Sequence, residues 1–125
     1  MLRYKTNTIE LAENGIVYFR SEADDLYTDQ DLIQILELVE KEAGNKPFLL
    51  LMVVNGHEFL MTKEARNLFS TYEKAFKLIK AEAVILQSVP SKILYNLLTR
   101  IHSPKFPFKA FTDEERAVKW LLKHK

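Results

Sequence analysis

Polar and apolar residues alternate in two short stretches near the N-terminus. Residues 8–12 and 16–20 are rich in residue types that favour extended structure, and Asn14 and Gly15 lie between them. An Asn-Gly pair tolerates the positive φ angles of a tight turn. The pattern therefore predicts an antiparallel β-hairpin.

Apolar residues then recur three or four positions apart, as one face of an amphipathic helix requires. These residues are Leu32, Ile35, Leu36, Val39 and Ala43. Thr28 offers a capping hydroxyl just before them, and Asp29 and Asp31 place acids at the positive end of the helix dipole. Gly44 ends the pattern. We predict a helix from about Asp29 to Gly44 that packs on a sheet.

Three apolar runs predict further strands. Residues 47–54 are apolar at every position, which is typical of a strand buried on both faces, so we place this run in the middle of the sheet. Residues 82–87 form a second buried strand, and residues 108–111 form a short third one.

Helical spacing separates these strands. It begins at Thr62, a candidate cap, and continues as one helix or two through Ala65, Leu68, Phe69, Tyr72, Phe76 and Ile79. Pro90 suits the first turn of a helix that ends near Ser103. Thr112 to Glu115 reads as a capping box that opens a last helix, with its inward residues at Ala117, Val118, Leu121 and Leu122.

The predicted order of elements is β-β-α-β-α-β-α-β-α. Strands that alternate with helices form parallel pairs through right-handed crossovers, whereas a three-residue turn forces the first pair to be antiparallel. We therefore predict an α/β fold in which residues 1–125 form a single domain around a five-stranded, mixed and mostly parallel sheet.

Composition narrows the class of protein. The chain has no cysteine, which excludes disulfides, thiol catalysis and thiolate metal sites. It has no apolar segment of about 20 residues and no signal-peptide core, so we expect a cytoplasmic protein.

Charge is divided unevenly along the chain. Residues 1–62 carry 5 basic and 11 acidic residues, whereas residues 63–125 carry 13 and 6. Several basic residues of the second half are interleaved with Phe106, Phe108 and Phe111, as in some surfaces that bind single-stranded nucleic acid or anionic lipid: Lys92, Arg100, His102, Lys105 and Lys109. Because the net charge is only +1, we interpret both halves as solvated faces and do not expect a nucleic-acid partner.

Motifs for catalysis, metals or cofactors are absent from the sequence. His57, His102 and His124 stand alone, and there is no G-x-S-x-G nucleophile motif. We predict a non-enzymatic protein without a metal or a cofactor. A weaker candidate is an anion site formed by Ser88, Ser91 and Lys92, where a strand gives way to a helix, and an ordinary strand-to-helix turn is the alternative.

Five short stretches, taken with the order of elements, resemble a known family. They are VNG at 54–56, MTKEAR at 61–66, SVPSK at 88–92, PKFP at 104–107 and FTDEERAVKWL at 111–121. The chain resembles small bacterial proteins of unknown function related to STAS domains, in the SpoIIAA-like superfamily. The resemblance implies a βα superhelix similar to sporulation anti-anti-sigma factors and, more distantly, to CRAL-TRIO lipid-transfer proteins.

The same resemblance points to Thr62. In anti-anti-sigma factors a hydroxyl at the start of the helix after the third strand is a phosphorylation switch, and Thr62 matches that place. Phe-Leu-Met precedes Thr62 where those proteins have an Asp-Ser-Ser type of motif, so the position is carried over and the activity is not. Thr62 is therefore either a helix cap alone or a cap and a phosphorylation site.

Two functions remain open. The first is a regulatory or protein-interaction module whose partner surface comprises Asn55, Gly56, Thr62, Lys63 and Arg66. The alternative is a domain that binds a lipid or another small apolar molecule between the sheet and Phe69, Tyr72 and Phe76. A homodimer is also expected, because residues 49–54 are apolar on both faces while the helices of a superhelical domain lie chiefly on one side.

Overall fold

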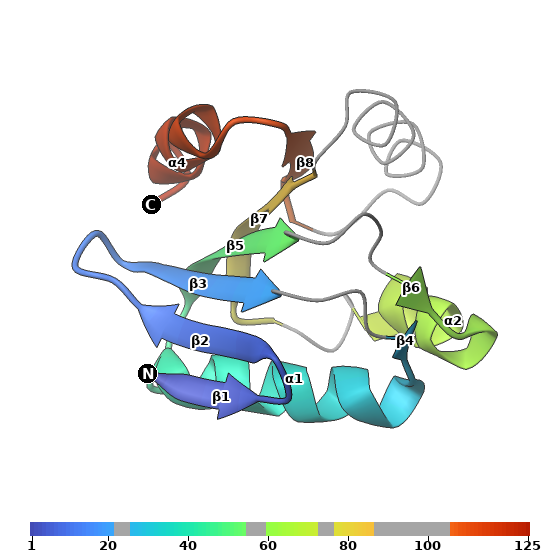
Figure 1. The fold of residues 1–125 in the computed structure, drawn as a ribbon. Coiled ribbons are helices and arrows are strands. Elements are labelled where there is room, and N and C mark those ends of the chain that lie inside the picture. Colours follow the sequence, from blue (N-terminus) through green and yellow to red (C-terminus); the bar gives the residue numbers. More distant parts are fainter. Residues whose placement is uncertain (22–25, 55–59, 73–76, 87–105) are drawn as a thin grey trace.

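A six-stranded sheet forms the centre of the protein in the computed structural model, which describes residues 1–21, 26–54, 60–72, 77–86 and 106–125 (Figure 1). The strand order is β1-β2-β3-β5-β7-β8, and a second, two-stranded sheet pairs β4 with β6. Pairing is antiparallel from β1 to β3 and parallel elsewhere. The strands are β1 Leu2–Tyr4, β2 Asn7–Leu11, β3 Ile16–Ser21, β4 Leu26–Tyr27, β5 Phe48–Val54, β6 Leu60–Met61, β7 Ile79–Ile85 and β8 Phe108–Phe111.

Helices cover both faces of the large sheet. The described helices are α1 Asp29–Glu42, α2 Lys63–Tyr72 and α4 Glu114–Leu122. Figure 1 shows α1 along one face and α4 on the opposite face. This arrangement confirms the predicted α/β class, the hairpin, the first and last helices and the central position of residues 48–54.

The sheet has one strand more than the five predicted. Strand β1 joins the edge of the sheet through pairs such as Leu2 with Ile9, but its three residues are too few to give a clear alternating pattern. The pair β4 and β6 has only two residues in each strand and was also missed. The predicted helix between Pro90 and Ser103 lies outside the described residues.

Two predicted boundaries were wrong. Ile79 does not belong to a helix: it opens β7 opposite Phe48, whose N–H donates to the Leu78 carbonyl 2.9 Å away. The backbone at Leu78 and Ile79 is hydrogen-bonded to or paired with β5, although Ile79 continues the helical spacing of apolar residues in the sequence. The cap of α4 is Asp113 and not Thr112, since the Asp113 carboxylate accepts the Glu115 N–H at 3.0 Å.

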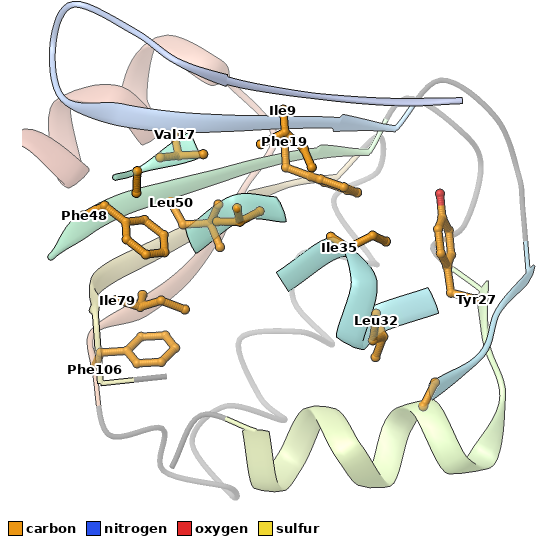
Figure 2. Close-up of a cluster of buried hydrophobic side chains, with 13 residues drawn as sticks. Ile9, Val17, Phe19, Tyr27, Leu32, Ile35, Phe48, Leu50, Ile79 and Phe106 are labelled. Carbon is orange, nitrogen blue, oxygen red and sulfur yellow. The ribbon is translucent and has the colours of Figure 1, made fainter. Parts of the chain in front are cut away.

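Strand β5 is buried on both sides. One cluster, shown in Figure 2, includes Phe48 and Leu50 and packs against α1, for example at Ile35. The other includes Leu49 and Leu51 and packs against two residues of α4, Ala117 and Leu121. Helix α4 therefore covers the second apolar face within the chain, and this face gives no reason to expect a homodimer.

A buried carboxylate joins the N-terminal strand to α1. Asp31 accepts hydrogen bonds from the Tyr4 hydroxyl at 2.6 Å and the Thr28 N–H at 3.0 Å, and the Lys5 ammonium lies 3.0 Å away. The Thr28 hydroxyl in turn accepts the Asp31 N–H at 3.1 Å, which completes a capping box. The predicted cap is confirmed, and it also fastens β1 to the helix.

This junction shifts two pKa values in opposite directions. Burial opposes ionisation of Asp31, but the hydrogen bonds from Thr28, Tyr4 and Lys5 outweigh it and hold the pKa of Asp31 well below its ordinary range. The hydrogen bond to Asp31, together with burial and the negative charge of that carboxylate, raises the pKa of Tyr4 to about 12. Ionised Asp31 and neutral Tyr4 are thus the pair that stabilises the fold.

We expect Leu50→Asp to unfold the domain. Leu50 is 1 % exposed, and an unpaired buried carboxylate costs several kcal/mol against a typical total stability of about 5–15 kcal/mol. The matched control is Leu26→Asp, because Leu26 is 57 % exposed and should tolerate the charge. Circular dichroism during thermal unfolding checks both variants. A folded Leu50→Asp protein with an unchanged melting temperature would show that β5 is not the core strand.

Stability should decline at both extremes of pH through the Asp31 junction. The pKa of Asp31 is lowered, so its contribution is present above the ordinary value of about 4 and is lost as the pH falls further. The pKa of Tyr4 is raised, so its contribution is present below about 10 and is lost as the pH rises toward 12.

Asp31→Asn should therefore lower the free energy of unfolding by about 2 kcal/mol at pH 7 and flatten the acid side of the profile. Asp113→Asn is the control, because that carboxylate is exposed and Asn caps a helix as well as Asp does. Urea unfolding between pH 2 and 12 measures both. Parallel profiles for the wild type and Asp31→Asn would contradict this account of the junction.

Candidate functional site

Thr62 lies between β6 and α2, and its hydroxyl and its N–H are both hydrogen-bonded. Its hydroxyl oxygen accepts the Ala65 N–H at 3.1 Å, which is the geometry of an N-cap. Its own N–H donates to the Tyr27 carbonyl at 2.9 Å. The residue is partly exposed, and Lys63 and Glu64 beside it are exposed. The predicted capping role of Thr62 is confirmed.

The short sheet of β4 and β6 aligns two similar units, each of which consists of a two-residue strand, a threonine and a helix. Leu26 pairs with Leu60, and Tyr27 pairs with Met61, in parallel register. In both units a threonine follows the strand and opens a helix, and in both its hydroxyl accepts the N–H three residues later at 3.1 Å. Helices α1 and α2 therefore begin next to each other at one end of the molecule (Figure 1).

The two helix starts differ in charge. In α1 the third helical residue is Asp31, whose carboxylate accepts a hydrogen bond from the Thr28 N–H. In α2 the third residue is Ala65, and Lys63 adds a positive charge in the first turn. A phosphate on the Thr62 hydroxyl would therefore lie at the positive end of a helix dipole beside a lysine, with Glu64 as the opposing charge.

A buried polar cluster is connected to Thr62 through Tyr27, whose carbonyl accepts the Thr62 N–H. Figure 2 shows the ring of Tyr27 at the side of the first cluster, with its hydroxyl directed toward the strands. That hydroxyl donates to Asn7 Oδ1 at 2.8 Å and lies 3.1 Å from Ser21 Oγ. All three residues are at most 1 % exposed. Sequence reasoning missed this cluster, although Asn7 and Ser21 occupy positions that the alternation with Ile9 and Phe19 marks as inward-facing.

The other predicted site residues lie either in α2 or outside the described residues. Arg66 lies in α2, as do Phe69 and Tyr72, which were named for an apolar ligand. Outside the described residues lie Asn55, Gly56, Phe76, Ser88, Ser91 and Lys92.

Neither a metal-binding cluster nor a membrane-spanning helix occurs in the described part of the chain. His124 packs against the Trp120 ring, with 4.7 Å between the ring centroids. Across the described ranges, no three His, Asp or Glu side chains gather in a way that could hold a metal ion. In the same part of the chain, no helix is long and apolar enough to cross a membrane.

Comparison with known proteins supports the fold. A solved structure, an uncharacterised protein of the DUF3478 family with a SpoIIAA-like fold from Shewanella loihica PV-4, matches with a TM-score of 0.63 and 20% sequence identity. The match covers 92% of this chain and 91% of that one, so the fold of this chain is SpoIIAA-like and the predicted resemblance is confirmed.

The sequence itself places the chain in a family. A comparison with curated proteins finds no match. A family model described as "Domain of unknown function (DUF7793)" matches residues 9–125, which is nearly the whole chain. The protein therefore belongs to the DUF7793 family.

Proposed function

We propose that this protein is a non-enzymatic regulatory module that binds a protein partner through the Thr62 surface. We define this surface as Thr62, Lys63 and Arg66, together with Asn55 and Gly56 from the segment before β6. The observation that carries the proposal is the position of Thr62: a partly exposed residue at a helix start, whose hydroxyl caps the helix and whose N–H donates to the Tyr27 carbonyl. A hydroxyl held in this way is presented to a partner in one orientation.

The chemistry of the helix start suits control by modification. Phosphorylation would add about 1.5 to 2 negative charges at pH 7, and the dipole of α2 and Lys63 favour an anion at that place. The same charge would alter which protein can approach, through repulsion or new pairing with arginine. The fold supports this use by analogy, because the position of Thr62 matches the switch hydroxyl of anti-anti-sigma factors.

A binding role also agrees with the kind of residues that meet here. The described groups around Thr62 are backbone amides, one hydroxyl and the exposed side chains of Lys63 and Glu64. Such groups can recognise the surface of a partner protein through hydrogen bonds and charge. We therefore assign binding to this site.

Stability measurements test the capping role of Thr62. Thr62→Ala should lower the free energy of unfolding by about 1 kcal/mol because the cap is lost, whereas Thr62→Asp should be tolerated because Asp also caps. Thr28→Ala is the matched control, since it removes the aligned cap of α1 and leaves Thr62 in place. Urea unfolding measures all three variants.

Partner capture then tests the function itself. Wild type, Thr62→Ala, Thr62→Asp and Thr28→Ala are each used to capture proteins from a lysate of the source cells, and mass spectrometry identifies what is bound. We expect the Thr62 variants to differ in their partners and Thr28→Ala to match the wild type. Identical partners for all four proteins, with no phosphate on Thr62 in protein from its own cells, would leave Thr62 a cap alone.

A further inference from the structure

Three rings contact one another in series where β8 meets α4. The ring centroids of Phe111 and Trp120 are 5.7 Å apart, and those of Trp120 and His124 are 4.7 Å apart. Phe111 is buried, whereas Trp120 and His124 are partly exposed. Helix α4 and the residues after it therefore hold two aromatic rings that are partly open to solvent.

Basic side chains lie around these rings. The Lys109 ammonium is 5.3 Å from the ring centroid of Phe111, in a cation–π contact. Arg116 is four residues before Trp120 and Lys123 is three residues after it, so both are its neighbours on the helix surface. All three basic residues are exposed. We define the β8–α4 surface as Lys109, Arg116, Trp120, Lys123 and His124.

Nearby acidic residues do not cancel this charge. The acids of residues 106–125 are Asp113, Glu114 and Glu115, at the start of α4, and each is in an ion pair. No ion pair between described residues involves Lys109 or Lys123. The start of α4 and Lys123 are about 14 Å apart along the helix axis, which exceeds the screening length of about 8 Å at physiological salt.

The uneven charge of the sequence is also uneven in space. Helix α1 contains five acidic residues and one lysine, and it lies on the face of the large sheet opposite α4 (Figure 1). The net charge of +1 argues against a nucleic-acid partner only if acids and bases are mixed over the surface. The fold instead separates the acids of α1 from the bases around Trp120.

We propose that the β8–α4 surface binds single-stranded nucleic acid. Phosphates lie at Lys109, Arg116 and Lys123, and a base stacks on the exposed part of the Trp120 ring. Partly exposed aromatic rings among cations are the usual components of such sites, and only unpaired bases offer their faces to them. This binding does not depend on the Thr62 surface.

An anionic lipid surface fits this place less well. A helix that binds a bilayer inserts its apolar face among the lipid headgroups. The apolar face of α4 is not free, because Ala117 and Leu121 are fully buried against the sheet. The aromatic rings that remain lie at the side of the helix, where a single base can contact them.

Trp120 provides the test, because it is the only tryptophan of the chain. We expect a single-stranded oligothymidylate of about 12 nucleotides to quench Trp120 fluorescence, and a duplex of the same length or inorganic polyphosphate to change it little. Equal quenching by polyphosphate would reduce the surface to a non-specific group of cations and overturn the proposal. No quenching at low salt, or binding to phosphatidylserine vesicles but not to the oligothymidylate, would also overturn it.

Variants locate the binding, which is measured by the fluorescence anisotropy of a labelled oligothymidylate. Lys123→Gln should lower the slope of log affinity against log salt by about 0.7, the value for one lost phosphate contact, and Trp120→Leu should weaken binding about tenfold. Lys41→Gln is the matched control, because Lys41 is exposed on α1. If Trp120→Leu does not fold, the two lysine variants still decide the outcome. Equal affinities and salt slopes for Lys123→Gln and Lys41→Gln would overturn the proposal.

Discussion

The fold depends on one constraint: strand β5 is apolar on both faces and must be covered on both. Leu49 and Leu51 point to one side, Phe48 and Leu50 to the other, and all four are nearly inaccessible to water. A strand of this kind is stable only between two layers, and helices α1 and α4 supply these layers on opposite faces of the sheet. Strands β3, β5 and β7 pair in parallel. Each connection between them crosses over the sheet and brings the chain back to the end at which the previous strand began.

The candidate site results from this arrangement. The described helices that follow strands on the α1 side are α1 and α2, and the short pair of β4 and β6 aligns their first turns. Thr28 and Thr62 thereby cap neighbouring helices in the same way, but the charged residues around them differ. Asp31 makes the Thr28 end a fixed structural junction with β1, whereas the Thr62 end has a lysine in its first turn and Thr62 itself is partly exposed.

Much of the fold could be predicted because its signals are local. The Asn14-Gly15 turn, the cap at Thr28 and the apolar run of β5 each depend on neighbouring residues, and each was confirmed. Ile79 was misassigned because helical spacing in the sequence does not reveal that the backbone at Leu78 bonds to another strand. The Asn7–Tyr27–Ser21 cluster joins three separate segments, so no local pattern could define it, although the inward phase of Asn7 and Ser21 was a usable signal.

The central claim is that the Thr62 surface contacts a protein partner, and site-specific photo-crosslinking tests it most directly. A photo-crosslinking amino acid is placed in the source cells at the position of Lys63 or, as a control, of Lys109, which is exposed on β8. The account predicts a covalent adduct with one protein from position 63 that is absent from position 109. No adduct from position 63, or the same adducts from both positions, would contradict it.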